Sequence, residues 1–196
     1  MVNGKGGDLV RNPKENQMTI DEFYEFRKVN DGLWEYIDGV VYMSPSPSTM
    51  HQRISMRLSS QLFNLLKGKK CEVFSAPFDV ELKNEWMSDI KIVIPDISVI
   101  CDKSGLGEQK YVGVPTLIIE IVSPSNQSHD LVLKLNLYMQ YGVKEYWIVN
   151  PLFNTIQVFH LNEDGHYVQT TVIKETGKAS SSVIDGFIVQ AESCFA

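Results

Sequence analysis

The chain has 196 residues, of which 43% are hydrophobic, and a net charge of −6, a composition typical of a soluble globular protein. It holds no apolar run of about 18 residues, which excludes a predicted membrane-spanning helix. The acidic charge excludes a broadly basic surface of the kind that wraps nucleic acid, so any such contact is expected through a local patch.

The first 18 residues are polar and glycine-rich, without the apolar core of a secretory signal, and they predict a flexible tail before a single domain over 19–196. Three widely spaced cysteines, an odd number, favour a reducing compartment over a disulfide framework. No CxxC or HxxxH spacing is present, so no structural zinc site is expected. The predicted location is cytoplasmic.

The predicted elements alternate between helices and strands. A capping-box pair, Thr19 and Glu22, opens a short helix over about 19–28. Segment 33–45 alternates around an Asp-Gly turn and predicts a hairpin, and a long helix follows the Ser-Pro repeats and ends at Gly68. The remaining predictions are strands over 71–82, 90–100, 116–123 and 145–150, a helix over about 129–141, and a hairpin of 155–161 with 166–173. This order predicts one α/β domain with a mixed sheet.

Two acidic residues, Asp96 and Glu120, stand inside consecutive apolar strand-like runs. A buried carboxylate is costly unless it is paired or metal-bound. Because side chains alternate along strands, neighbouring strands would project both carboxylates from one side, as ligands suited to Mg²⁺. The alternatives are that Asp96 ends a strand after Pro95, and that Glu120 pairs with a buried Lys or Arg.

Lys134 shares a helix face with Leu131, Leu135 and Tyr138, so it is predicted to point inward. A lysine in that place needs an anion, which a carboxylate pair or a phosphate would supply. The alternative is a snorkelling lysine whose stem covers apolar surface.

Five features in this order resemble a known family: "WEYIDGVVYMSPSPSTMHQRI", "VIPDISVI", "LIIEIVSPS", Lys134 and "YGVKEYWIVNP". Together they are similar to the PD-(D/E)XK nuclease superfamily and, more narrowly, to the Uma-two family of restriction-endonuclease-like proteins. The resemblance covers roughly residues 19–161. It implies a restriction-endonuclease-like α/β fold, with a mixed central β-sheet flanked by helices and an additional N-terminal hairpin.

The resemblance also implies a DNA endonuclease that depends on Mg²⁺, with Mn²⁺ as a possible substitute. Asp96 would be the bridging metal ligand, Glu120 the second ligand, and the Ile121 carbonyl a third oxygen. Lys134 would orient the attacking water or stabilise charge on the phosphate. The superfamily pattern puts this lysine where Val122 stands, so in this sequence it has moved to the following helix.

Two further candidates come from the N-terminal half. The superfamily often adds an acidic residue there, and Glu35 is preferred over Asp38, which precedes Gly39 and has an ordinary turn role. His51, at the start of the long helix, would bind phosphate or water; alternatively it is satisfied by Ser48 or by the backbone.

A second function stays open, in which a catalytically degenerate nuclease fold binds nucleic acid or a protein partner without cleavage. Val122 and the acidic charge favour it. Lys67, Lys69 and Lys70 either stay solvated at the end of the long helix or help to hold DNA. The exposed character of the last hairpin predicts an edge that pairs with a second copy, and so a homodimer.

Overall fold

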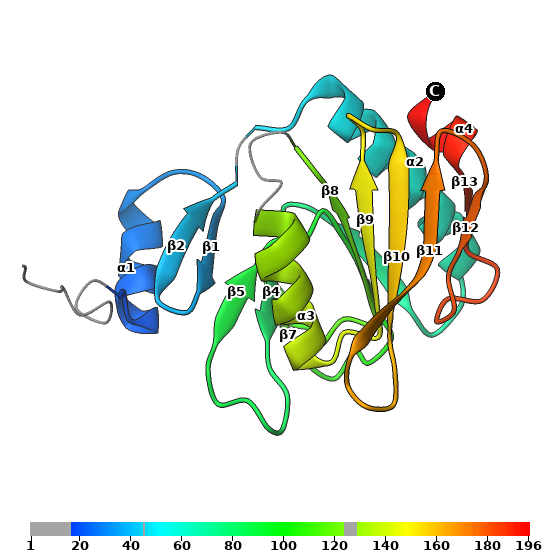
Figure 1. The fold of residues 1–196 in the computed structure, drawn as a ribbon. Helices are drawn as coiled ribbons and strands as arrows, with labels where there is room; N and C mark the ends of the chain where they lie inside the picture. Colours follow the sequence, from blue (N-terminus) through cyan, green and yellow to red (C-terminus); the bar gives the residue numbers. More distant parts are fainter. Residues whose placement is uncertain (1–16, 45, 124–128) are drawn as a thin grey trace, which may run out of the picture.

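The computed structural model describes residues 17–44, 46–123 and 129–196 (Figure 1). The helices are α1 (Ile20–Val29), α2 (Thr49–Leu66), the π-helix η2 (His129–Lys134), α3 (Leu135–Tyr141) and α4 (Ala191–Phe195). The strands are β1 (Trp34–Ile37), β2 (Val40–Met43), β3 (Glu72–Ser75), β4 (Asp79–Leu82), β5 (Lys91–Val93), β6 (Ile97–Ile100), β7 (Lys110–Gly113), β8 (Leu117–Ile121), β9 (Glu145–Asn150), β10 (Thr155–Leu161), β11 (Tyr167–Lys174), β12 (Lys178–Ser180) and β13 (Ile188–Gln190).

Helix α1 begins at its predicted capping box, and α2 begins just after the Ser-Pro repeats, as predicted. Thr19 N donates to Glu22 Oε2 at 2.7 Å and Glu22 N donates to Thr19 Oγ1 at 3.3 Å, the two bonds of a capping box. Ser48 caps α2 by accepting a hydrogen bond from His51 N at 3.2 Å. Gly68, at φ +75°, follows the end of α2 in the left-handed conformation that glycine adopts readily. Local sequence therefore places His51 in the first turn of α2.

The predicted mixed sheet is confirmed as a six-stranded sheet in the order β11-β10-β9-β8-β6-β3. Its β8–β9 pair is parallel and the other pairs are antiparallel. A five-stranded sheet in the order β2-β1-β5-β4-β7 contains the N-terminal hairpin. Asp38 and Gly39 form its turn with φ of +54° and +79°, the left-handed values of a type I′ turn.

Helices α2 and α3 pack on opposite faces of the six-stranded sheet (Figure 1). The inward residues of α2 share one core cluster with Ile119 and Ile121 of β8, whereas those of α3 share another with Ile118 and Val122. Since strand side chains alternate, Glu120 projects to the face that α3 covers. This geometry brings the end of η2 and α3 to Glu120.

Two of the predicted strands are wrong in extent. In the structure, each of these segments forms two strands, which belong to different sheets. Segment 71–82 is divided into β3 and β4 around Pro77, and segment 90–100 into β5 and β6 around Pro95. Proline has no N–H to donate to a ladder, so the chain leaves one sheet and enters the other at these points. Strand β7 was not predicted. Asp96 consequently lies on an irregular segment just before β6.

The predicted helix over 129–141 is wrong in one respect, because its first part is the π-helix η2. The predicted inward direction is confirmed for Lys134, which is 4% exposed, and for Tyr138, which is fully buried. The side chain of Leu131 lies outside the described residues. Widened turns of this kind occur often at functional sites, and Lys134 stands at the junction with α3.

The expectation against a disulfide is wrong, because Cys71 and Cys101 are bonded. The β3–β6 register pairs Glu72 with Ile100, so the two cysteines face each other one position beyond the ladder. This cross-strand partnership has no signature in sequence spacing. Cys194 is not in the disulfide, and burial raises the pKa of its thiol to about 11. Disulfides are rare in reducing compartments, so the cysteines no longer support a cytoplasmic location.

The remaining predictions concern the two ends of the chain. Residues 1–16 of the predicted tail lie outside the described part, whereas Met18 packs beside Phe23 and its N–H donates to Gly39 O at 2.8 Å. The hairpin of β10 and β11 is confirmed, and β11 is the last strand of its sheet. Across the described residues, no helix is both long and apolar enough to cross a membrane.

Candidate active site

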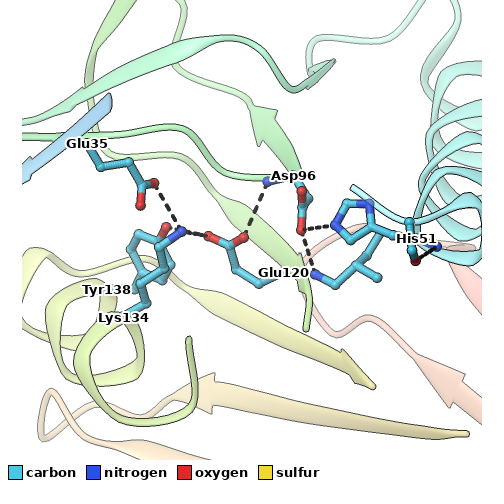
Figure 2. Close-up of polar contacts among 8 residues, drawn as sticks. Glu35, His51, Asp96, Glu120, Lys134 and Tyr138 are labelled. Carbon is cyan, nitrogen blue, oxygen red and sulfur yellow. Dashed lines mark hydrogen bonds and ion pairs between the residues drawn. The ribbon is translucent and has the colours of Figure 1, made fainter. Parts of the chain in front are cut away.

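Asp96 and Glu120 meet where β6 begins and β8 ends. The β6–β8 register pairs Ile97 with Ile119, which puts Asp96 opposite Glu120 one position further along. Asp96 Oδ2 accepts a hydrogen bond from Ile121 N at 2.7 Å, and Glu120 Oε2 lies 3.4 Å from Asp96 N (Figure 2). The structure thus brings together the two carboxylates that the sequence singled out.

Lys134 joins Glu120 to a third carboxylate, Glu35 of β1. Its Nζ lies 2.9 Å from Glu120 Oε1 and 3.0 Å from Glu35 Oε1. Glu35 and Glu120 are each 3% exposed, so the ammonium neutralises charge in a buried setting. The structure therefore brings Glu35 to the site, whereas Asp38 lies at the hairpin turn and pairs with Lys91.

The break between β5 and β6 supplies backbone donors to these carboxylates. Ile94 N donates to Glu35 Oε1 at 2.7 Å, and Asp96 N points to Glu120. Pro95 between them has no N–H, so both neighbouring amides are released from the ladder and are available to the side chains. Pro95, which divides the predicted strand 90–100 into β5 and β6, is thus part of the reason why the acidic residues gather here.

Tyr138 is a site residue that the sequence analysis assigned only to the helix interior. Its hydroxyl donates to Glu120 Oε1 at 2.8 Å, the same oxygen that Lys134 contacts (Figure 2). The signal was present in the sequence, because Tyr138 follows Lys134 by four residues and so lies on the same helix face. Burial, followed by the charges of Glu120 and Glu35, raises the pKa of Tyr138 well above its usual value.

Replacing Tyr138 with phenylalanine is expected to lower the unfolding free energy at pH 7 by about 1.5–3 kcal/mol, because a hydrogen bond to a charged acceptor is lost in a buried place. The same change is expected to make the protein less sensitive to alkali. Above about pH 10 the unfolded chain releases its tyrosine protons, whereas a tyrosine with a raised folded pKa keeps its proton. Each such tyrosine lowers the unfolding free energy by about 1.4 kcal/mol per pH unit in that range.

Urea denaturation between about pH 7 and 11.5 measures both effects. Wild type and Tyr138→Phe are expected to keep a constant difference below pH 9 and to converge above pH 10, since Tyr167 and Tyr141, whose pKa values are also raised, remain in both proteins. Parallel curves up to pH 11.5 would show that Tyr138 does not hold its proton in the folded state.

His51 connects α2 to the site. Its Nε2 lies 3.1 Å from Asp96 Oδ2, and the two side chains are 13% and 19% exposed. With its proton on Nε2, the imidazole donates to this oxygen and, with Ile121 N, fixes the rotation of the Asp96 carboxylate. The structure therefore places His51 beside a carboxylate, in contact with a predicted metal ligand.

The arrangement fits a hard divalent cation. Asp96 Oδ1 accepts no hydrogen bond from the described residues, so it can face a ligand while Oδ2 is held in place. The N–H of Ile121 points to Asp96, and in an extended strand the carbonyl of the same residue points to the same side. Asp96 Oδ1 and the Ile121 carbonyl are thus the oxygens that could face an ion, with Glu120 Oε2 beside them. Among the described residues, no cluster of three or more His, Cys, Asp or Glu side chains that could hold a metal is found.

Comparisons with known proteins identify the family and the fold of this chain. The uncharacterized protein slr1290 of Synechocystis is 28% identical over 153 residues, which are 78% of each chain. A crystal structure described as "a putative nuclease belonging to DUF820", from Anabaena variabilis, superposes with a TM-score of 0.71 at 20% identity, over 91% of this chain and 97% of the other, and so shares the fold. Residues 20–192 match the Uma2 family, described as "Putative restriction endonuclease". The chain therefore belongs to the Uma2 family of restriction-endonuclease-like proteins.

Proposed function

We propose that this chain is a divalent-metal-dependent endonuclease that hydrolyses DNA phosphodiester bonds. The observation that carries the proposal is the pair Asp96 and Glu120, which meet beside the buried ammonium of Lys134. Membership of the Uma2 family supports the same class of reaction.

Each residue has a distinct part in the proposed reaction. A bound Mg²⁺ or Mn²⁺ would lower the pKa of a coordinated water and neutralise charge on the scissile phosphate. Asp96, Glu120 and the Ile121 carbonyl would hold the ion. Lys134 would orient the attacking water or a phosphate oxygen, since its ammonium already lies against the Glu120 carboxylate. Glu35 would hold the lysine in that position.

The proposed assembly is a homodimer of single nuclease domains. Strand β11 ends the six-stranded sheet and carries Val168 and Val172, which are 49% and 58% exposed. An uncovered edge with exposed β-branched residues is prone to pair with another strand. Two sites in one assembly would allow both strands of a duplex to be cut. A cytoplasmic location fits action on cellular DNA.

The direct test is cleavage of a mixed panel of single- and double-stranded DNA in Mg²⁺, in Mn²⁺ and in a chelator. Cleavage that requires the metal, and that Asp96→Ala and Lys134→Ala both abolish, supports the proposal in full. Cleavage that persists in Lys134→Ala would remove the lysine from the chemistry and keep the metal site. DNA binding without cleavage in any metal would contradict the enzyme and favour the degenerate, binding-only alternative.

A further inference from the structure

A groove of about 350 Å³ separates α2 from β3, the edge strand of the six-stranded sheet opposite to β11. It lies outside the set of residues assigned to the reaction. Its lining residues come from two elements only: Ser59, Ser60, Phe63 and Asn64 of α2, with Val73 and Ser75 of β3. We call it the α2–β3 groove.

Two of the α2 residues that line this groove, Ser59 and Phe63, continue a row of side chains that starts in the candidate active site. Residues four apart lie one above the other on a helix. The row consists of His51, Ser55, Ser59 and Phe63, and Lys67 follows at the end of the helix. With a rise of 1.5 Å per residue, it spans about 24 Å.

Strand β3, on the other side of the groove, also ends next to the candidate active site. Ser75 of β3 pairs with Ile97, the residue after Asp96. Ala76 N donates to Asp96 O at 3.0 Å. His51, at the start of the α2 row, also contacts Asp96, so the row of α2 and the end of β3 both lead from the groove toward a predicted metal ligand.

The side chains in the groove suit a polymeric ligand whose units carry flat rings and polar atoms. Phe63 is 61% exposed, so its ring is available for stacking. Ser60 and Asn64 add polar side chains beside this ring. Stacking on exposed aromatic rings is the usual way in which proteins hold single-stranded nucleic acid without reading its sequence.

The helix and turn beside the groove form a segment that carries basic residues and no acidic residue, although the chain as a whole is acidic. Residues 49–71 contain no Asp or Glu and five basic residues: Arg53, Arg57, Lys67, Lys69 and Lys70. The three lysines are exposed in the turn that joins α2 to β3, at the end of the groove away from Asp96. The carboxylate of Glu72, which follows that turn, is paired with Lys103 at 2.5 Å.

We propose that the α2–β3 groove holds a single DNA strand that leads from Lys67, Lys69 and Lys70 to the catalytic carboxylates. This inference rests on the proposed nuclease function in one respect only, the assignment of the carboxylates at the end of the strand's path as catalytic. A volume of about 350 Å³ has room for about one nucleotide of that strand, whose neighbouring nucleotides would lie over the row of α2 on either side, and a duplex is too wide to enter it. An extended peptide could add to the edge of β3, but the exposed turn of Lys67, Lys69 and Lys70 favours phosphates over a peptide backbone.

The test measures binding of a dye-labelled single strand of about 20 thymidines to the full chain by fluorescence anisotropy, in chelator, at roughly 50 to 200 mM salt. Phe63→Ala is expected to raise the Kd by roughly 5- to 150-fold, the loss of one stacked base. The triple change of Lys67, Lys69 and Lys70 to Gln is expected to reduce the slope of log K against log salt by about 2. Matched controls are Trp86→Ala, an aromatic side chain that is 71% exposed on another loop, and the exposed triple of Lys144, Lys174 and Lys178 to Gln.

A second readout keeps this inference separate from the proposed function. Hydrolysis of bis(p-nitrophenyl) phosphate with Mn²⁺ needs the metal site but no groove, so both groove variants are expected to match wild type. If no diester is hydrolysed while the groove variants still weaken DNA binding, the groove stands and the nuclease does not. If wild type fails to bind the strand, or the groove variants bind like the controls, the groove proposal is overturned.

Discussion

Replacing Lys134 with methionine is expected to lower the unfolding free energy by about 3–5 kcal/mol and to abolish metal-dependent DNA cleavage. The ammonium lies between Glu35 and Glu120, both 3% exposed, and its removal leaves two carboxylates facing each other in a poorly solvated place. Methionine has a similar length and fills the volume, so the loss reports charge rather than packing. Urea denaturation followed by circular dichroism measures the stability.

The double variant Glu35→Gln with Lys134→Met gives a sharper test. It removes one charge of each sign, so it is expected to recover part of the lost stability and none of the cleavage. Lys103→Met is the matched control, because Lys103 pairs with Glu72 at the surface and is expected to matter by less than about 1 kcal/mol. If the urea midpoint of Lys134→Met equalled that of wild type, the ion pairs of Lys134 with Glu35 and Glu120 would not stabilise the folded protein.

Replacing Asp96 with asparagine is expected to abolish Mn²⁺ binding and to reduce the cleavage rate by at least about 10³-fold, since the ion stabilises transition-state charge by several kcal/mol. The amide keeps the shape of the carboxylate, and its oxygen can still accept the hydrogen bond from Ile121 N. The folded state is therefore expected to survive. Calorimetric titration with Mn²⁺ and the cleavage rate are the two measurements.

Asp38→Asn is the matched control for that experiment. Asp38 is the acidic residue set aside in favour of Glu35, and it lies in the turn at φ +54°, where asparagine is tolerated. It is expected to leave Mn²⁺ binding and cleavage at the wild-type level. Normal Mn²⁺ affinity in Asp96→Asn, or its loss in Asp38→Asn, would mean that the ion is held elsewhere.

The parts of the fold that depend on neighbours in sequence could be predicted. The capping box at Thr19, the start of α2 and the turn at Asp38–Gly39 each require contacts within a few residues. The inward direction of Lys134 followed from helical spacing, even though the preceding turns are a π-helix. Such features survive because their geometry is set by the backbone within one or two turns.

The rule that a carboxylate in a buried strand marks a site was useful but incomplete. Glu145 is fully buried at the start of β9 and was not considered. Its oxygens accept hydrogen bonds from Trp147 Nε1 at 2.7 Å and from the backbone N and hydroxyl of Ser182 at 2.7 and 2.6 Å. It joins β9 to the segment before β13 and lies away from Asp96. Only the partners in space distinguish such a residue from Glu120.

By itself, the sequence determined α1, α2, the β1–β2 and β10–β11 hairpins, the acidic pair and an inward lysine, because periodicity and capping act over short distances. Helix α4 and the β12–β13 pair were not predicted. The tertiary structure alone decided where the chain changes sheets at Pro77 and Pro95, and that Cys71 faces Cys101. It also decided the register that sets Asp96 opposite Glu120, and the approach of Glu35 to Lys134. These are pairings between segments far apart in the chain, and they are selected by the packing of whole sheets and helices rather than by any local preference.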